Sequence, residues 1–348
     1  MPGAAVAVWQ DGDFVAERYA GEASAGVAVD ESTLFALASV TKPVVAAAMM
    51  ALVDEGSAGL DNAVIDIVPE FGQPDASPTE HDKWRPSVTI RQLMSHTSGL
   101  PEDLPRKWFA DQPAPRFEVI ADALIARPLE YQPGTQMVYS NAAFALLGRV
   151  IERKSGANIW DLVWERVLDP LQLRNTVDRP GPSLDHRIAR VRDPGNEGRE
   201  TESYNSQYWR DLGIPWGGLY GSARDLATFA ASFLASGSSF LSTTSSDAMT
   251  SDQIKGLSGT VQSLRVHWPQ ASWGLGWEVK GDKRKHWTGE LTSPATFCHF
   301  GAAGTMLWAD PQHQIAAAIF ANRTTFHLWP FRPPRWSRLS NSIVSALT

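Results

Sequence analysis

Apolar residues near both ends of the chain have the pattern of β-strands. Residues 4–9 and 14–19 are two apolar, β-prone runs, and the Asp11-Gly12 pair between them is typical of a tight hairpin. Towards the other end, short apolar runs are separated by glycines or by an Asp-Pro pair. We predict four strands there, at residues 273–280, 296–300, 305–310 and 315–321.

The strongest helix pattern follows Pro43, where an apolar run extends from Val44 to Val53. Pro43 lacks a backbone N–H and is tolerated only near a helix start, and Gly56 fits a position just after the helix end. Because the run is apolar on all sides, we expect this helix to be buried. Further helices are predicted at residues 90–95, 117–126, 141–155, 159–168, 223–234 and 337–347.

Two segments have the composition of linkers. Residues 236–251 are rich in serine and threonine. The apolar residues Leu241 and Met249 within this segment are spaced as in a capped helical turn, so we do not interpret it as a linker. Residues 329–336 are rich in proline and arginine. We interpret them as a solvated loop before the last helix rather than as a partner-binding segment.

Two N-terminal strands, a helical middle and several C-terminal strands predict an α+β fold. We expect a three-layer α/β/α arrangement, with one antiparallel sheet built from both chain ends and flanked by helices. Residues 1–60 and 219–348 would form this sheet domain, and residues 61–218 an inserted, mostly helical domain. The 348 residues are too many for a typical single compact core, which agrees with this division.

Charge and composition exclude several classes of partner. The net charge of −7 and the pI near 5.6 argue against nucleic acid. Cys298 is the single cysteine and excludes an intrachain disulfide, and the longest apolar run is too short to span a bilayer. The N-terminus lacks a secretory pattern, so we expect a cytoplasmic protein, or a periplasmic or secreted one if a leader was trimmed. The oligomeric state stays open.

The stretch Ser39-Val40-Thr41-Lys42 places a hydroxyl and a primary amine at the predicted start of the buried helix. Residues at i and i+3 share a helix face, so the Lys42 amine is expected to reach the Ser39 oxygen. A serine alcohol needs a neighbouring base, and burial beside a positive helix N-terminus would lower the lysine pKa towards that of a usable base. The alternative is an ordinary helix cap followed by a solvated lysine.

The stretch Tyr139-Ser140-Asn141 lies at the start of another predicted helix. A tyrosine phenol can shuttle protons if a nearby cation holds its pKa down, and Asn141 is expected to orient Lys42 and to donate to a substrate carbonyl. The alternative is a structural helix start, with Ser140 as the cap and Tyr139 as an apolar anchor.

The stretch His299-Phe300-Gly301 ends one predicted strand, and Ala302 opens the turn into the next. Glycines here permit close backbone approach, so this edge could align a substrate and supply backbone N–H groups to an oxyanion hole. The alternative is a tight turn with a half-buried histidine. A similar stretch, Trp287-Thr288-Gly289, precedes a proline-containing loop. We therefore rank it second as a candidate for the strand that aligns the substrate.

In this order and on these elements, Ser-x-x-Lys, Tyr-Ser-Asn and His-x-Gly resemble the serine β-lactamase and penicillin-binding protein superfamily. The class C β-lactamases, the D-alanyl-D-alanine carboxypeptidases and the family VIII carboxylesterases look most similar. Further segments extend the resemblance over nearly the whole chain: residues 34–38, 93–100, 216–219 and 274–277. The resemblance implies a β-lactamase/DD-peptidase-like fold and a serine hydrolase with an acyl-enzyme intermediate. It implies no metal and no organic cofactor.

The resemblance also implies roles for the residues that carry the reaction. Ser39 would be the acylated nucleophile, and the backbone N–H groups of Ser39 and Ala302 would form the oxyanion hole. Lys42 and Tyr139 would share the general base and acid work.

Other residues would hold the substrate or the scaffold. Asn141 would position the substrate, while His299 and Gly301 would lie on the strand beside it. His96 would be structural in its loop despite its reactive side chain.

The third motif departs from the Lys-Thr-Gly or His-Thr-Gly of β-lactamases and many peptidases, whose hydroxyl and cation contact a substrate carboxylate. Here Phe300 has no hydroxyl, and His299 is mostly neutral at pH 7. Losing a charge-assisted hydrogen bond, about 1.5–3 kcal/mol, penalises penicillins and acyl-D-Ala-D-Ala peptides more than neutral esters. We therefore expect a carboxylesterase for small or medium acyl or aryl esters. A β-lactamase, a D-Ala-D-Ala carboxypeptidase and a D-amino-acid amidase are the alternatives.

Four tryptophans have two possible locations. They either border the cleft, where they would suit acyl or aryl groups, or fill the core: Trp209, Trp216, Trp273 and Trp287.

Two other classes of protein are the alternatives to a serine hydrolase. The first is a non-catalytic binding protein of this fold, and the joint presence of the three motifs speaks against it. A metallohydrolase is disfavoured because the histidines include no His-x-x-x-His pair.

Overall fold

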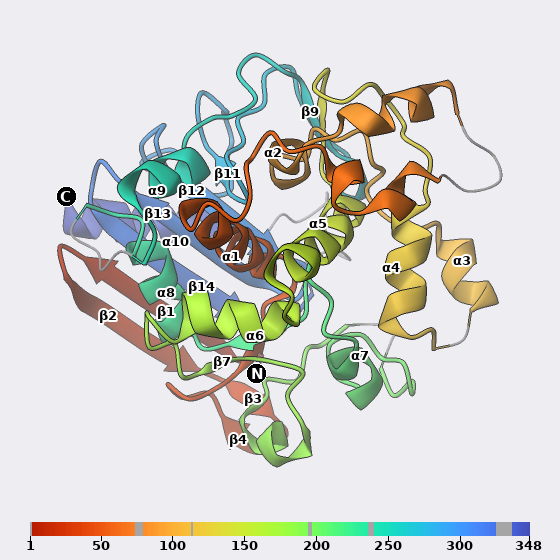
Figure 1. The fold of residues 1–348 in the computed structure, drawn as a ribbon. Coiled ribbons are helices and arrows are strands. Elements are labelled where there is room, and N and C mark those ends of the chain that lie inside the picture. The colour runs from red at the N-terminus through yellow and green to blue at the C-terminus, as the bar shows by residue number, and fades with distance from the viewer. Residues whose placement is uncertain (1, 74–78, 113, 194–196, 236–239, 325–335) are drawn as a thin grey trace.

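A computed structural model describes residues 2–73, 79–112, 114–193, 197–235, 240–324 and 336–348. Its centre is a six-stranded antiparallel sheet in the order β11-β12-β13-β14-β1-β2 (Figure 1). The strands are β1 (Ala4–Gln10), β2 (Asp13–Ala20), β11 (Glu278–Val279), β12 (Phe297–Gly301), β13 (Thr305–Asp310) and β14 (Ile315–Ala321). Because β1 pairs along its whole length with β14, the two chain ends build one sheet, as predicted.

Two residues of left-handed backbone close the N-terminal hairpin. Asp11 has a φ of 50° and Gly12 a φ of 107°, the conformation that an Asp-Gly turn provides and that matches the twist of the flanking strands. The predicted hairpin is therefore confirmed.

The two faces of the sheet pack against different helices, which gives three layers (Figure 1). On one face, Val8 and Trp308 form an apolar cluster with Trp336 of α10 (Trp336–Leu347). On the other face, alternate residues of the same strands join the main core, and α8 (Ala223–Ala231) contacts β1, β13 and β14. Because successive side chains of a strand point to opposite faces of the sheet, each face contributes apolar residues to a different cluster.

Helix α1 (Thr41–Asp54) lies in the middle of the molecule, and its residues 41–52 are all buried. Pro43 occupies the first turn, and Gly56, with a φ of 74°, follows the helix end as expected. Helix α1 contacts α5 and α6 in addition to the turn that precedes it. An all-round apolar helix is the pattern expected for this central position.

The middle of the chain is mostly helical, as predicted. Its α-helices are α2 (Ile90–Met94), α3 (Arg106–Asp111), α4 (Phe117–Ile125), α5 (Asn141–Ser155), α6 (Ile159–Val163) and α7 (Gln207–Leu212), and a π-helical turn, η5 (Trp164–Leu168), continues α6. Short 3₁₀ turns are η1 (Ala38–Val40), η2 (Val64–Asp66), η3 (Pro69–Gly72), η4 (Glu80–Ser87), η6 (Pro182–Arg187) and η7 (Gln262–Leu264). The division at residues 60 and 218 stays a prediction.

Several short strands were not predicted. They form three small sheets from β3 (Glu22–Ser24), β4 (Val27–Ala28), β5 (Phe35–Ala36), β6 (Met137–Val138), β7 (Thr176–Asp178), β8 (Leu219–Gly221), β9 (Gly259–Val261) and β10 (Val266–Trp268). Runs of two or three residues carry too little periodicity to be recognised alone.

Three predicted elements need correction. The strand at residues 273–280 shrinks to β11, because Gly276 has a φ of 87° and lies so close to α1 that an added Cβ would stand 2.4 Å from the Ala46 Cβ. The helix predicted to reach residue 234 ends at Ala231. The serine-rich segment contains a full helix, α9 (Thr243–Thr250), capped by Ser242.

The loop predicted at residues 329–336 lies outside the described residues, apart from Trp336, which begins α10. No helix within the described ranges has the length and hydrophobicity that crossing a bilayer requires.

Candidate active site

Ser39 lies in the tight turn η1, between strand β5 and helix α1. The preceding residue, Ala38, has a φ of 47°, which is uncommon for a residue with a side chain and is found where the surroundings enforce it. The backbone N–H of Leu37 is bonded to the Leu219 carbonyl of β8, which fixes the entry to the turn. The half-buried Ser39 side chain is thereby held at the mouth of two cavities.

Lys42 is fully buried, and its Nζ donates to three oxygens: Ser39 Oγ at 3.2 Å, Asn141 Oδ1 at 2.8 Å and the Trp216 carbonyl at 2.9 Å. Burial lowers the pKa of Lys42 to about 7, although the nearby carboxylates of Asp103 and Glu102 oppose the shift. At neutral pH a large fraction of the amine is therefore uncharged and can accept the Ser39 proton. The predicted contact between Lys42 and Ser39 is therefore present, and the pKa of Lys42 is lowered as predicted.

Tyr139 follows strand β6 and is 9% exposed, with its ring 4.7 Å from the Lys42 Nζ. Burial raises the pKa of its phenol, although the Ser39 side chain lies close enough to favour the ionised form. The hydroxyl has no full hydrogen-bond partner among the described residues. The condition for a proton-shuttling phenol, a pKa held down by a nearby cation, is not met, because burial is the largest influence and raises the pKa. At neutral pH the phenol therefore keeps its proton and can act as a hydrogen-bond donor.

Asn141 is the first residue of α5, whose N-terminus is capped by Ser140. Its Oδ1 accepts from Lys42, and its Nδ2 donates to Asp103 Oδ2 at 2.9 Å. The amide therefore orients the lysine as predicted. The Asn141 Nδ2 group was expected to donate to a substrate carbonyl, but the structure shows it donating to Asp103.

Gly301, at the end of β12, packs directly against the turn that carries Ser39. An added Cβ would stand 2.2 Å from the Leu37 carbonyl oxygen and 2.3 Å from Thr305 Oγ1. Thr305 also donates to that carbonyl at 2.9 Å. Only glycine permits this approach, which places Ala302 beside Ser39 in the lining of both cavities.

His299 precedes this contact on β12 and is 3% exposed. Its Nδ1 lies 3.0 Å from the Phe300 carbonyl oxygen, which can only accept, so Nδ1 carries the hydrogen. Nε2 is then a buried lone pair without a partner among the described residues. Burial, with the Lys42 charge as the second cause, lowers the pKa of His299 to about 3. The ring is neutral and presents an acceptor to the cavity.

Two cavities meet at Ser39, and both are lined by Ser39, Tyr139, Ser263 and Ala302. We call the first the apolar pocket; it encloses about 30 Å³, and its other lining residues are Val261, Leu264, Trp273, Glu278, His299 and Phe300. We call the second the acidic pocket; it encloses about 210 Å³, and its distinctive lining residues are Glu102, Asp103, Tyr204, Trp209 and Trp216. Asn141 also lines the acidic pocket.

Of the four tryptophans expected at the cleft, Trp209, Trp216 and Trp273 line these pockets. Trp287 does not, because its indole N–H donates to Glu278 at 2.9 Å and its ring packs on Phe300. Sequence reasoning missed Glu102, Asp103 and Tyr204, which lie in loops without a motif of their own.

His96 has the expected structural role. It is fully buried, and its Nδ1 accepts from the Ser140 N–H at 3.0 Å, which ties its loop to the start of α5. Its ring packs 4.6 Å from that of Tyr139, and it lines neither cavity.

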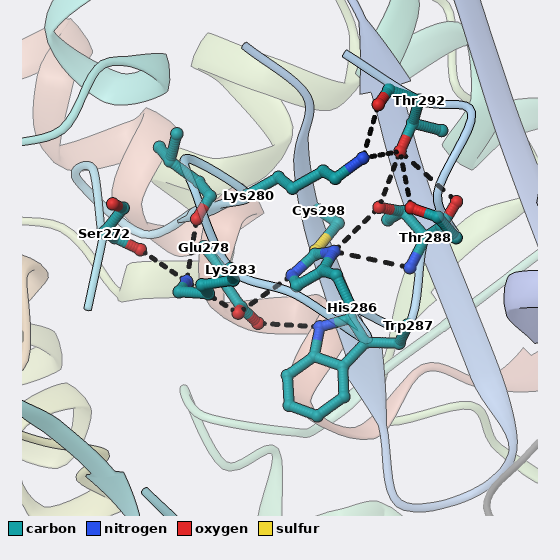
Figure 2. Close-up of polar contacts among 11 residues, drawn as sticks. Ser272, Glu278, Lys280, Lys283, His286, Trp287, Thr288, Thr292 and Cys298 are labelled. Carbon is teal, nitrogen blue, oxygen red and sulfur yellow. Dashed lines mark hydrogen bonds and ion pairs between the residues drawn. The ribbon is translucent and has the colours of Figure 1, made fainter. Parts of the chain in front are cut away.

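The stretch Trp287-Thr288-Gly289 belongs to a buried polar network around Glu278 (Figure 2). Glu278 also lines the apolar pocket. Glu278 accepts from Lys283 at 2.8 Å, from His286 at 3.1 Å and from Trp287. Donor atoms of Glu278, His286 and Cys298 lie within 4.8 Å of one another, as in some metal sites. Lys283 already supplies the positive charge at this carboxylate, so the cluster does not fit a metal ion.

The fold and this site define a serine hydrolase of the β-lactamase and penicillin-binding protein fold. The chain belongs to the beta-lactamase family, since the family profile described as "Beta-lactamase" matches residues 1–335. Penicillin-binding protein 4 of Amycolatopsis lactamdurans is 30% identical over 336 residues, which cover 92% of this chain and 81% of that protein.

Solved structures agree with this assignment. A penicillin-binding protein homologue from Caulobacter crescentus is 25% identical, with a TM-score of 0.76 over 99% of this chain and 92% of that one. A family VIII carboxylesterase shares the fold with a TM-score of 0.78 at 22% identity, over 99% of this chain and 93% of that one.

Proposed function

We propose that this serine hydrolase is a carboxylesterase that acts on short-chain esters through an acyl-enzyme on Ser39. Lys42, as the free amine, takes the Ser39 proton while Oγ attacks the ester carbonyl. The backbone N–H groups of Ser39 and Ala302 receive the negative oxygen of the tetrahedral intermediate. Tyr139 then protonates the departing alcohol, and water releases the acid from Ser39 by the reverse sequence.

The observation that carries the proposal is the lack of a cationic side chain among the described residues that line the two pockets. No lysine or arginine is among the described residues that line them. His299 is neutral and offers a lone pair, and Phe300 has no hydroxyl. Penicillins and acyl-D-Ala-D-Ala peptides carry a carboxylate that would find no cationic partner among these lining residues, whereas a neutral ester avoids that cost.

The size of the apolar pocket supports short acyl groups. A cavity of about 30 Å³ has room for few heavy atoms, since one water-sized probe already needs about 10–15 Å³. An aryl or other bulky alcohol portion fits only the larger acidic pocket. The acyl portion is therefore assigned to the apolar pocket.

The test compares p-nitrophenyl acetate, butyrate and octanoate with a chromogenic cephalosporin, using the native protein and Ser39→Ala. We expect kcat/KM to be highest for acetate, to fall by at least about tenfold to octanoate, and to be lower still for the cephalosporin. Rapid cephalosporin cleavage with negligible ester cleavage would overturn the proposal in favour of a β-lactamase.

A further inference from the structure

We propose that the acidic pocket binds a positively charged alcohol portion, so that the preferred substrates are short-chain esters of amino alcohols or quaternary ammonium alcohols. This inference rests on the proposed esterase function and names the substrate class of the same site. It is carried by the charge of the pocket, by its aromatic walls and by an unpaired hydroxyl between the two cavities.

Two adjacent carboxylates give the pocket its charge. Glu102 is 9% exposed and accepts from the Ser263 N–H at 3.0 Å, and burial, with the charge of Asp103 as a further cause, raises its pKa. Asp103 is exposed and keeps an acceptor role towards Asn141. A bound ammonium would lower the pKa of both groups, because an opposite charge favours the ionised form.

Aromatic rings form the rest of the wall. The rings of Tyr204 and Trp209 meet edge to face with centroids 5.2 Å apart, and Trp216 packs on Phe117 with centroids 6.2 Å apart. Ring faces attract ammonium groups, and aromatic cages that bind quaternary ammonium ions use this attraction. Carboxylates and aromatic rings around one cavity are complementary to a bulky organic cation, not to a carboxylate.

The Tyr139 hydroxyl is the independent sign of a ligand at this place. It is more than nine-tenths buried, it has no full hydrogen-bond partner among the described residues, and its residue lines both pockets beside Ser39. A substrate oxygen between the two pockets would satisfy this donor. With the acyl group in the apolar pocket, that oxygen is the leaving alcohol, and the cation attached to it lies in the acidic pocket.

The experiment compares acetylthiocholine with 3,3-dimethylbutyl thioacetate, in which a carbon replaces the charged nitrogen and the shape is unchanged. Water cleaves each thioester to acetate and a thiol, which a disulfide reagent detects. We expect kcat/KM to be about tenfold or more higher for acetylthiocholine at low ionic strength, with a smaller ratio in high salt. A ratio near one would overturn the inference and leave the esterase function standing.

Variants show which residues cause the preference for acetylthiocholine over the uncharged thioester. The ratio should fall towards one in Trp209→Leu and in the double variant Glu102→Gln with Asp103→Asn, and it should be largely kept in Trp209→Phe. Because the ratio is taken within each variant, a general loss of activity cancels. Asp211→Asn is the matched control, since this exposed carboxylate lies on α7 with Trp209 but does not line the pocket. An equal fall in Asp211→Asn would contradict a local site.

A second readout does not need turnover. We expect choline to slow the labelling of Ser39 by a fluorophosphonate at concentrations at which 3,3-dimethylbutan-1-ol has no effect. If the protein cleaves cephalosporins but no esters, the proposed function fails, while protection by choline would still support the cation site. Equal protection by the two alcohols, or none by choline, would overturn the inference in either case.

Discussion

Changing Lys42 to methionine is expected to lower kcat for p-nitrophenyl acetate by about 10³-fold, with little change in KM. The amine is fully buried and 3.2 Å from Ser39 Oγ, and it is the nearest group whose pKa, about 7, suits a base at neutral pH. A positioned general base contributes about 10²–10⁴-fold to such reactions. Initial rates with the purified variant, normalised to folded protein, provide the measurement.

Lys280→Met is the matched control for this substitution. Lys280 is also buried, but its Nζ donates to Thr292 (Figure 2), and Lys280 is not among the residues that line either pocket. We expect its rate per folded molecule to stay within about threefold of native. A Lys42→Met enzyme as active as Lys280→Met would exclude Lys42 as the base.

The pH profile gives a second check of the same base. Because the uncharged amine is the active form, kcat/KM should fall about tenfold per pH unit below pH 7 and level off above it. The residual activity of Lys42→Met should lack this slope. A native profile that falls as the pH rises through 7 would have the wrong sign for a lysine base.

Replacing Glu278 with leucine is expected to lower the free energy of unfolding by about 3–5 kcal/mol. Its carboxylate and the Lys283 ammonium are each about 1% exposed and 2.8 Å apart, so the substitution leaves a buried charge without its counter-ion. Burial alone would raise the pKa of Glu278, but Lys283 and His286 lower it to about 2. Denaturant unfolding at neutral pH provides the measurement.

A double variant separates the ion pair from simple packing. Glu278→Leu with Lys283→Met removes both charges, so it should be less destabilised than the sum of the two single variants. The lowered carboxyl pKa also predicts that this contribution is complete above about pH 4.5 and is lost as the pH falls towards 2. Strict additivity of the two substitutions would show that the charges do not interact.

The sequence predicts the positions of Ser39, Lys42 and Asn141 because local features of the chain determine them. The three-residue spacing of Ser39 and Lys42, with Pro43 at the helix start, places both side chains at one helix end, and the structure bonds them. Ser140 is a recognisable cap, which places Asn141 at the first turn of α5. The fold follows in the same way, from short apolar, β-prone runs at both chain ends.

The sequence does not predict the surroundings of the site, because long-range contacts decide them. Glu102 and Asp103 carry no motif, and they reach the cavity through hydrogen bonds to Ser263 and Asn141. Strand β6 pairs with β9, more than a hundred residues later, and neither is long enough to show a period. The raised pKa of Tyr139 could not be predicted for a related reason, since burial depends on the whole fold.

The central claim is that one alcohol, Ser39, forms the covalent intermediate. Reaction with a fluorophosphonate, followed by proteolysis and mass spectrometry, locates the adduct directly. We predict a single labelled peptide that contains Ser39, no adduct in Ser39→Ala, and loss of ester turnover in that variant. Labelling at another residue, or unchanged turnover by Ser39→Ala, would contradict the account.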